Sequence, residues 1–177
     1  MIDLKVKLGD RFCLKNPIMT ASGTCGYGND LNDIIDINKY GALVTKSLSL
    51  KPRKGNPPPR IVETPSGMIN SIGLANIGVE SFLKEKKVPL KKYQGKLIVN
   101  IAGKTEQEFI EVTNILDKEK WIDGYEINVS CPNVKQGGIA FGTDPEVLYR
   151  LSKKIRGLTD KFLIIKLSPN VTNIREL

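Results

Sequence analysis

Short apolar segments alternate with segments of helical periodicity along most of the chain. The apolar segments have the length of strands and cover residues 17–21, 42–46, 96–101, 125–129 and 162–167. Strands that are apolar on both faces need cover on both sides, which favours a parallel sheet over an antiparallel one. The pattern therefore predicts an α/β fold in which helices connect parallel strands.

The segments between these strands carry helix signals. Thr105 and Glu108 have capping-box spacing at the start of a helix that runs to residue 116. The helix that begins at Asp144-Pro145 has proline in its first turn, where proline is favoured. Two further helices are expected, over residues 76–87 and, behind an Asn29-Asp30 cap, over residues 31–37.

Two regions interrupt the alternation. Residues 4–8 and 11–14 alternate in polarity around a Gly9-Asp10 turn and predict an N-terminal β-hairpin. Residues 47–75 are rich in proline and glycine and predict a long loop. Within it, residues 51–60 resemble a polyproline ligand, but an ordered excursion over the mouth of the fold is the better interpretation.

Polar residues recur at the carboxyl ends of all five expected strands. They are Ser22 and Gly23, Lys46 and Ser47, Asn100, Asn128 and Lys166. A TIM (β/α)8 barrel gathers its active site on that face, whereas a doubly wound sheet concentrates it at a switch point, and no GxGxxG follows the first strand. We therefore expect residues 1–177 to form one partial barrel domain, truncated to about the first five βα units, with strands 6–8 absent.

Composition narrows the class of protein. The chain has 27 basic and 19 acidic residues, a net charge of +8, but its lysines show no run interleaved with aromatic residues. A solvated surface explains that charge better than nucleic-acid binding does. The N-terminus lacks a signal-peptide pattern, and no apolar run approaches the roughly 18 residues of a membrane span. We expect a soluble, cytoplasmic protein.

Three cysteines, Cys13, Cys25 and Cys131, show no CxxC spacing, which argues against a disulfide framework and against a metal or iron–sulfur site in this chain. Cys131 lies in the polar loop Asn128-Val-Ser-Cys-Pro-Asn133, directly after an expected strand. Because the chain contains no histidine, a general base must be Cys, Asp, Glu, Lys or Tyr. A thiol, with a pKa of about 8.5, is suited to that role. Simple packing is the alternative.

Six motifs occur in order along nearly the whole chain: Pro17-Ile-Met-Thr-Ala-Ser-Gly23, Thr45-Lys-Ser47, Asn70-Ser-Ile-Gly-Leu-Ala-Asn76, Val99-Asn100, Asn128-Val-Ser-Cys-Pro-Asn133 and Ile165-Lys-Leu-Ser-Pro-Asn170. Together they resemble the N-terminal portion of class 1 dihydroorotate dehydrogenases, the FMN enzymes that oxidise dihydroorotate to orotate in pyrimidine biosynthesis. The loop over residues 135–145 is similar to that of subclass 1B, whose members work with an FAD and iron–sulfur subunit and reduce NAD.

The resemblance implies a role for each motif. Cys131 would be the base that removes the C5 proton of dihydroorotate while hydride leaves C6 for the flavin. Lys46 would reach both flavin and substrate, and Lys166 the N1/O2 edge of the flavin. The alternative for each lysine is a side chain that extends from the strand end into water. The implied substrate-binding residues are Lys46, Asn70, Ser71, Ile72, Gly73, Leu74, Asn128 and Asn133. The implied FMN-binding residues are Ala21, Ser22, Gly23, Lys46, Ser47, Asn100, Asn128 and Lys166. Local turn bonding is the alternative role for the asparagines.

The resemblance also implies partners. FMN would bind the catalytic subunit, while FAD and a 2Fe–2S cluster would belong to the partner subunit, in a heterotetramer built on a catalytic homodimer. Because barrels commonly hold a phosphate after strands seven and eight, this fragment is expected to be inactive alone. Two alternatives stay open: an FMN-barrel reductase that acts on a uracil-like ring, and a non-catalytic basic fragment that binds nucleic acid or serves assembly.

Overall fold

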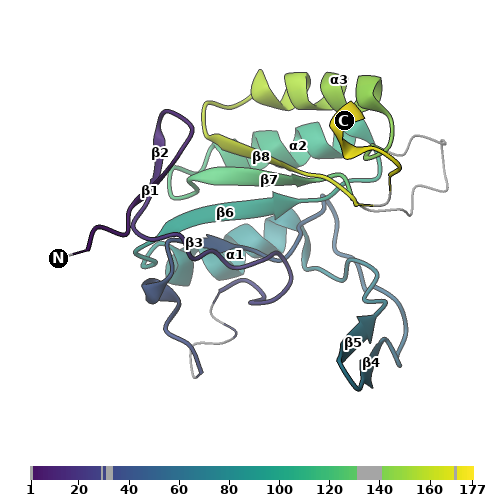
Figure 1. Ribbon diagram of the computed structural model, residues 1–177, viewed down its shortest axis with the longest axis horizontal. Helices are drawn as coiled ribbons and strands as arrows, with labels where there is room; N and C mark the ends of the chain where they lie inside the picture. Colours follow the sequence, from purple (N-terminus) through teal and green to yellow (C-terminus); the bar gives the residue numbers. More distant parts are fainter. Residues whose placement is uncertain (1, 29, 31–33, 131–140, 170) are drawn as a thin grey trace.

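The computed structural model describes residues 2–28, 30, 34–130, 141–169 and 171–177. A parallel sheet lies at its centre, with strand order β3-β6-β7-β8 (Figure 1). The strands are β3 (Ala42–Val44), β6 (Lys96–Ile101), β7 (Gly124–Asn128) and β8 (Phe162–Lys166). The helices between them are α1 (Gly78–Leu90), α2 (Glu106–Asp117) and α3 (Pro145–Arg156). The predicted α/β fold with a parallel sheet is confirmed.

The sheet buries a different cluster on each face. Leu97, Val99 and Ile101 point to the helices and join a cluster that includes buried residues of α1, α2 and α3. Ile98 points to the other face, where it packs with Phe12 of the hairpin formed by β1 (Val6–Leu8) and β2 (Phe12–Leu14). The hairpin, which the sequence predicted, lies toward the amino ends of the strands (Figure 1). It therefore fills one end of this face and leaves the carboxyl end to other side chains.

The predicted helix caps are present. The Thr105 hydroxyl accepts a hydrogen bond from the Glu108 amide at 3.2 Å, and the Asp144 carboxylate accepts one from the Glu146 amide at 2.9 Å. Both side chains satisfy amides that have no partner inside the helix. Within the described ranges, no helix is long and apolar enough to cross a membrane.

Two predicted elements differ from the structure. Residues 34–36 are not helical, and a 3-10 helix, η1 (Ile37–Lys39), follows them behind an Asp36 cap; residues 31–33 are outside the described residues. The segment 17–21 makes only an isolated parallel bridge, between Met19 and Ala42. Thr20 explains the interruption, because its hydroxyl both accepts from the Val44 amide and donates to the Val44 carbonyl, at 2.8 and 3.1 Å.

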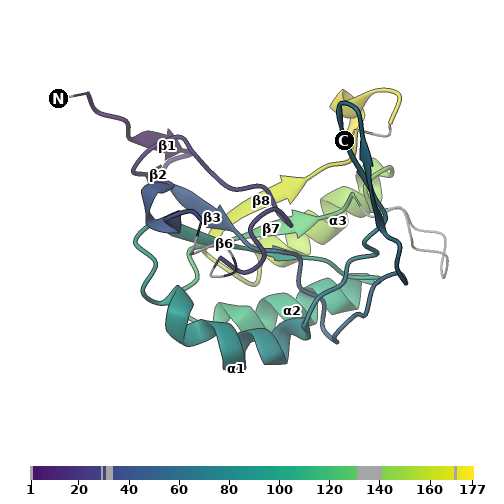
Figure 2. The same ribbon diagram turned by 90° about the horizontal axis from the view of Figure 1, so that it is seen from below.

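The predicted loop over residues 47–75 contains a second β-hairpin, and the prediction was wrong there. Strands β4 (Ile61–Thr64) and β5 (Gly67–Asn70) pair antiparallel, with Val62 opposite Ile69. Their side chains are exposed or half-buried, so the sequence shows no clean alternation between a buried and a solvated face. The hairpin projects from the body on the side where β6 and β7 end (Figures 1 and 2).

Candidate active site

Strand geometry gathers polar side chains at the carboxyl end of one face of the sheet. Successive residues of a strand point to opposite faces, so Asn100 shares the face of Ile98, and Lys166 the face of Ile164. Ile98 and Ile164 both belong to the cluster opposite the helices. In the register of the sheet, Asn128 pairs with Lys166. Three of the predicted site residues therefore lie on one face, at neighbouring strand ends.

Glu126 joins two of these residues and was not predicted from the sequence. One of its carboxylate oxygens, Oε1, accepts a hydrogen bond from Asn100 Nδ2 at 2.5 Å and lies 3.8 Å from Lys166 Nζ. The glutamate itself is buried, with 9% of its surface exposed. The signal that was available is a single acidic residue between Tyr125 and Ile127 in the strand Gly124–Asn128.

Hydrogen bonds fix the backbone of Asn100, while one acceptor atom of its side chain has no partner among the described residues. Its backbone amide donates to the Thr45 hydroxyl at 3.2 Å, and its carbonyl accepts from the Leu48 amide at 2.8 Å. Its side-chain oxygen, Oδ1, is buried and finds no hydrogen-bond partner among the residues that the structure describes. A buried polar atom without a partner is unusual in a folded protein and requires an explanation.

Asn128 and Ser47 meet although they come from different parts of the chain. Asn128 Nδ2 donates to Ser47 Oγ at 3.3 Å, and both residues are buried. Asn128 Oδ1 in turn accepts a hydrogen bond from the Ser130 hydroxyl at 2.6 Å. The bond between Asn128 and Ser47 therefore ties the end of β7 to the segment that follows β3.

The loop that follows the Met19 bridge is attached next to Lys46. The Lys46 amide donates to the Gly26 carbonyl at 2.7 Å, and the Lys46 side chain is half-buried. The predicted cofactor residues Ala21, Ser22 and Gly23 form a turn in this loop, where Gly23 adopts a φ of 89° that favours glycine. Ser22 is half-buried, whereas Ala21 and Gly23 are exposed.

The predicted substrate residues of the hairpin region occupy a separate segment at the end of β5. Asn70 and Ser71 are exposed, while Ile72, Gly73 and Leu74 are half-buried. Asn56 fixes their path, because its amide donates to the Ile72 carbonyl at 3.1 Å and its Nδ2 to the Ser71 carbonyl at 2.7 Å. No hydrogen bond in the described part of the chain joins this segment to Asn100, Asn128 or Lys166.

Cys131 and Asn133 lie outside the described residues. The residues on either side of the segment 131–140 are described and lie together. A Cβ added to Gly142 would stand 2.4 Å from the carbonyl oxygen of Val129, so the two backbones approach as closely as only glycine permits. The described residues that flank positions 131–140 therefore lie close together at the carboxyl end of β7.

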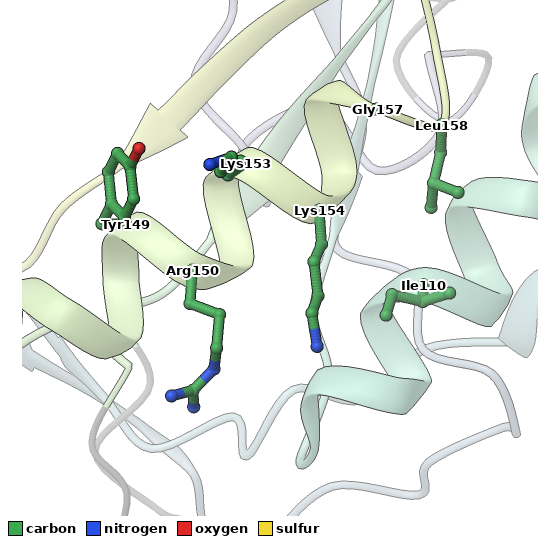
Figure 3. Close-up of a pocket in the computed structure, with 7 residues that line it drawn as sticks. All are labelled: Ile110, Tyr149, Arg150, Lys153, Lys154, Gly157 and Leu158. Carbon is green, nitrogen blue, oxygen red and sulfur yellow. The ribbon is translucent and has the colours of Figure 1, made fainter.

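A cavity of about 590 Å³ lies away from this site, between α2 and α3 (Figure 3). It is lined by Ile110, Tyr149, Arg150, Lys153, Lys154, Gly157 and Leu158.

Glu106 forms ion pairs with Lys154 and with Arg150, the latter at 3.0 Å. The hydrogen bonds from Lys154 and then from Arg150 hold the pKa of the Glu106 carboxyl below its usual range. Arg150 and Lys154 of α3 thus neutralise the charge of Glu106 on α2. We interpret these ion pairs as a structural link between the two helices and call them the Glu106 clamp.

Known proteins are similar to this chain over nearly its whole length. The dihydroorotate dehydrogenase family profile matches residues 4–177. The catalytic subunit of dihydroorotate dehydrogenase B (NAD(+)) from Geotalea uraniireducens is 53% identical over 93% of the chain and 54% of its own length. Its counterpart from a Thermoanaerobacter species is 51% identical over 98% of the chain and 57% of its own length. A protein of Aquifex aeolicus, provisionally named as the A (fumarate) type, is 54% identical over 99% of the chain and 57% of its own length.

The fold also has a solved counterpart. The dihydroorotate dehydrogenase of Eimeria tenella, in complex with ferulenol, matches with a TM-score of 0.76 at 19% identity, over 96% of this chain and 53% of the solved one. The chain thus spans about half the length of the curated relatives described above, between 54% and 57%. The profile match and identities above 50% over more than nine-tenths of the chain show that it belongs to the dihydroorotate dehydrogenase family.

Proposed function

We propose that this chain carries the flavin- and substrate-binding half of an FMN-dependent dihydroorotate dehydrogenase that passes its electrons to NAD. The observation that carries the proposal is the group formed by Asn100, Glu126, Asn128, Lys166 and Ser47, which lies at adjoining strand ends. It occurs in a chain 53% identical to a relative named as the catalytic subunit of the NAD-linked enzyme. Polar groups at that position are typical of an active site in a parallel α/β fold.

We infer that residues 1–177 correspond to the first five βα units of a (β/α)8 barrel domain. Four parallel strands and the Met19–Ala42 bridge at the β3 edge provide five strand positions. The likeness to the Eimeria tenella enzyme, over 53% of that chain, supports the same correspondence at the level of fold.

The polar residues of the strand ends fit an FMN molecule. Asn100 Oδ1 is buried without a donor among the described residues, and a flavin ring offers N–H groups that match such an acceptor. Lys166 adds a cation that favours the negative charge of a reduced flavin. Asn128, Ser47, Lys46 and the turn of Ala21, Ser22 and Gly23 complete the proposed FMN site. When bound, FMN supplies the acceptor for the hydride that leaves C6 of dihydroorotate.

We propose Cys131 as the base that takes the C5 proton. A thiolate accepts a proton near neutral pH, whereas a serine hydroxyl is a far poorer base. Ser130, which precedes Cys131 in the chain, hydrogen-bonds to Asn128 of the proposed FMN site. Cys131 is therefore attached to the chain next to that site.

The proposed substrate residues are matched to the chemistry of dihydroorotate. Its carboxylate needs a cationic partner once it is removed from water, and Lys46 provides one. Asn70, Asn128 and Asn133 offer the donors and acceptors that a ring of amide groups requires. Ile72, Gly73 and Leu74 contribute backbone amides beside that carboxylate, and Ser71 precedes them in the same proposed substrate segment.

We propose a separate electron-transfer subunit, carrying FAD and a 2Fe–2S cluster, as the route from FMN to NAD, with two catalytic subunits in the assembly. The support is that the relatives from Geotalea uraniireducens and Thermoanaerobacter are named as catalytic subunits of the NAD-linked enzyme. The three cysteines of this chain also lack the spacing of a cluster ligand set.

The proposal is tested with the full-length protein, meaning the product of the whole reading frame that contains this chain, loaded with FMN. Under anaerobic conditions, dihydroorotate is expected to bleach the flavin absorbance, and dihydrouracil is not, because it lacks the carboxylate that Lys46 binds. NAD then restores the absorbance only when the partner subunit is added. Bleaching by dihydrouracil alone would instead identify a reductase of uracil-like rings.

A further inference from the structure

Burial of the Glu126 carboxylate carries a cost in folding free energy. It lies between Tyr125 and Ile127, which are both fully buried, and only 12% of its own side chain is exposed. Removing an ionised carboxylate from water is strongly unfavourable unless the charge is paired and hydrogen-bonded. A strand of this kind accommodates an apolar residue more easily, so the carboxylate calls for a reason beyond packing.

The contacts of Glu126 connect three neighbouring strands through one atom. Oε1 of Glu126 on β7 accepts from Asn100 Nδ2 on β6 at 2.5 Å, and Lys166 Nζ on β8 lies 3.8 Å from it. Asn100 and Glu126 are direct partners in the register of the sheet. The pairing of these side chains therefore follows from the backbone and is not a chance contact between mobile groups.

The carboxylate decides which end of the Asn100 amide is free. An ionised carboxylate only accepts hydrogen bonds, so it must face the NH₂ group of Asn100. The opposite end, Oδ1, then points elsewhere, and this is the buried atom that has no partner in the described part of the chain. Asn100 is thereby presented to its surroundings as an acceptor.

We propose that Glu126 is the positioning residue of the flavin site. Its carboxylate holds Asn100 with the oxygen toward the cofactor, and it supplies the counter-charge that moderates the effect of Lys166 on the flavin. The inference rests on the proposed function. A buried negative charge beside the flavin opposes the negative charge that a reduced flavin gathers, so Glu126 lowers the reduction potential while Lys166 raises it.

The test compares Glu126→Gln with Glu126→Asp in the full-length, FMN-loaded protein. Glutamine keeps the shape but loses the charge and no longer fixes the Asn100 amide. We expect FMN binding to weaken about tenfold, because Asn100 can turn its donor end toward the cofactor. The equilibrium constant for flavin reduction rises about tenfold, which is about 30 mV for a two-electron couple. Glu126→Asp keeps the charge and stays near the unsubstituted potential. Glu85→Gln, at an exposed position on α1, is the control for loss of one negative charge.

An unchanged potential and FMN affinity in Glu126→Gln, in a protein whose parent oxidises dihydroorotate, overturns the inference. A parent protein that neither binds FMN nor reacts with dihydroorotate overturns the proposed function instead. The positioning role is then read without flavin, from the side-chain amide NMR signals of Asn100. We expect Glu126→Gln to move those signals strongly and Glu85→Gln to leave them in place, and equal spectra would contradict the role.

Discussion

At the scale of single residues, the choice of a proton acceptor is narrow. The chain has no histidine, and its 19 carboxylates are too weakly basic at neutral pH unless burial raises their pKa. Cys131 follows Ser130, which hydrogen-bonds to Asn128 at the end of β7. The ordinary thiol pKa of about 8.5 suits the role of base that we propose for Cys131.

Replacing Cys131 by serine is expected to lower the rate of dihydroorotate-dependent FMN reduction by about 10²- to 10⁴-fold at pH 7, the usual contribution of a general base. The remaining activity should increase toward high pH, because a hydroxyl loses its proton less readily than a thiol. Stopped-flow measurement of flavin bleaching, from pH 6 to pH 10, provides the profile. Cys13→Ser, at an exposed position on β2, is the matched control. A wild-type rate in Cys131→Ser would exclude the thiol as base.

The sequence predicted which residues lie at strand ends better than it predicted which of them contact one another. Asn100, Asn128 and Lys166 follow apolar runs, so their position at strand ends could be predicted from the sequence alone. Glu126 was missed because its role depends on the register of β6 and β7. That register pairs it with Asn100, which is 26 residues away in the chain. The free acceptor on Asn100 depends on that pairing in turn.

At the scale of secondary-structure elements, most signals that act within a few residues were reliable, but the Asn29-Asp30 cap was not, because residues 34–36 are not helical. The caps at Thr105 and Asp144 and the turn of the first hairpin are local, and the structure contains all three. The β4–β5 hairpin was missed because its strands are short and exposed on both faces, which removes the alternation that marks a strand. Residues 17–21 do not form the predicted strand, because the Thr20 hydroxyl bonds the backbone amide and carbonyl of Val44, which a strand partner would otherwise bond.

The Glu106 clamp between α2 and α3 gives a pH-dependent prediction at this scale. The pKa of Glu106 is lowered in the folded protein by hydrogen bonds from Lys154 and Arg150, so its stabilisation is present above the unfolded pKa of about 4.3 and is lost as the pH falls through the lower folded value. Because the cations are half exposed, we expect Glu106→Gln to cost only about 0.5 kcal/mol at pH 7. Thermal unfolding would show a decrease in Tm of about 1–2 °C at pH 7 that disappears as the pH falls through the folded pKa of Glu106.

Glu106 also lies in the first turn of α2, where any carboxylate interacts with the helix dipole. A double-mutant cycle with Lys154→Gln separates the ion pair from that effect, because the dipole term is the same on both sides of the cycle. A coupling energy of zero at pH 7 would show that the contact contributes nothing to stability.

At the scale of the whole molecule, the two edges of the sheet differ. The edge strand β3 is fully buried, with the Met19 bridge beside it, and β6 and β7 are almost entirely buried as well. Every residue of β8, at the other edge, is only partly buried. Within the described ranges no strand pairs with the outer side of β8, although its sequence, Phe-Leu-Ile-Ile-Lys, is as apolar as that of a central strand. An open edge of this kind favours association with further strands.

The open edge at β8 lies in a chain that covers 54% to 57% of the length of its relatives. In barrels of this class the phosphate of a bound cofactor is commonly held after strands seven and eight, beyond the five strand positions assigned to residues 1–177. We therefore expect a polypeptide of residues 1–177 alone to lose FMN on dialysis and to leave dihydroorotate unchanged, while the full-length protein retains the yellow cofactor through the same treatment. The flavin absorbance after dialysis measures the difference. Stoichiometric flavin retained by residues 1–177 would mean that the strand ends from Lys46 to Lys166 suffice to hold the cofactor, and that the open β8 edge has no part in binding it.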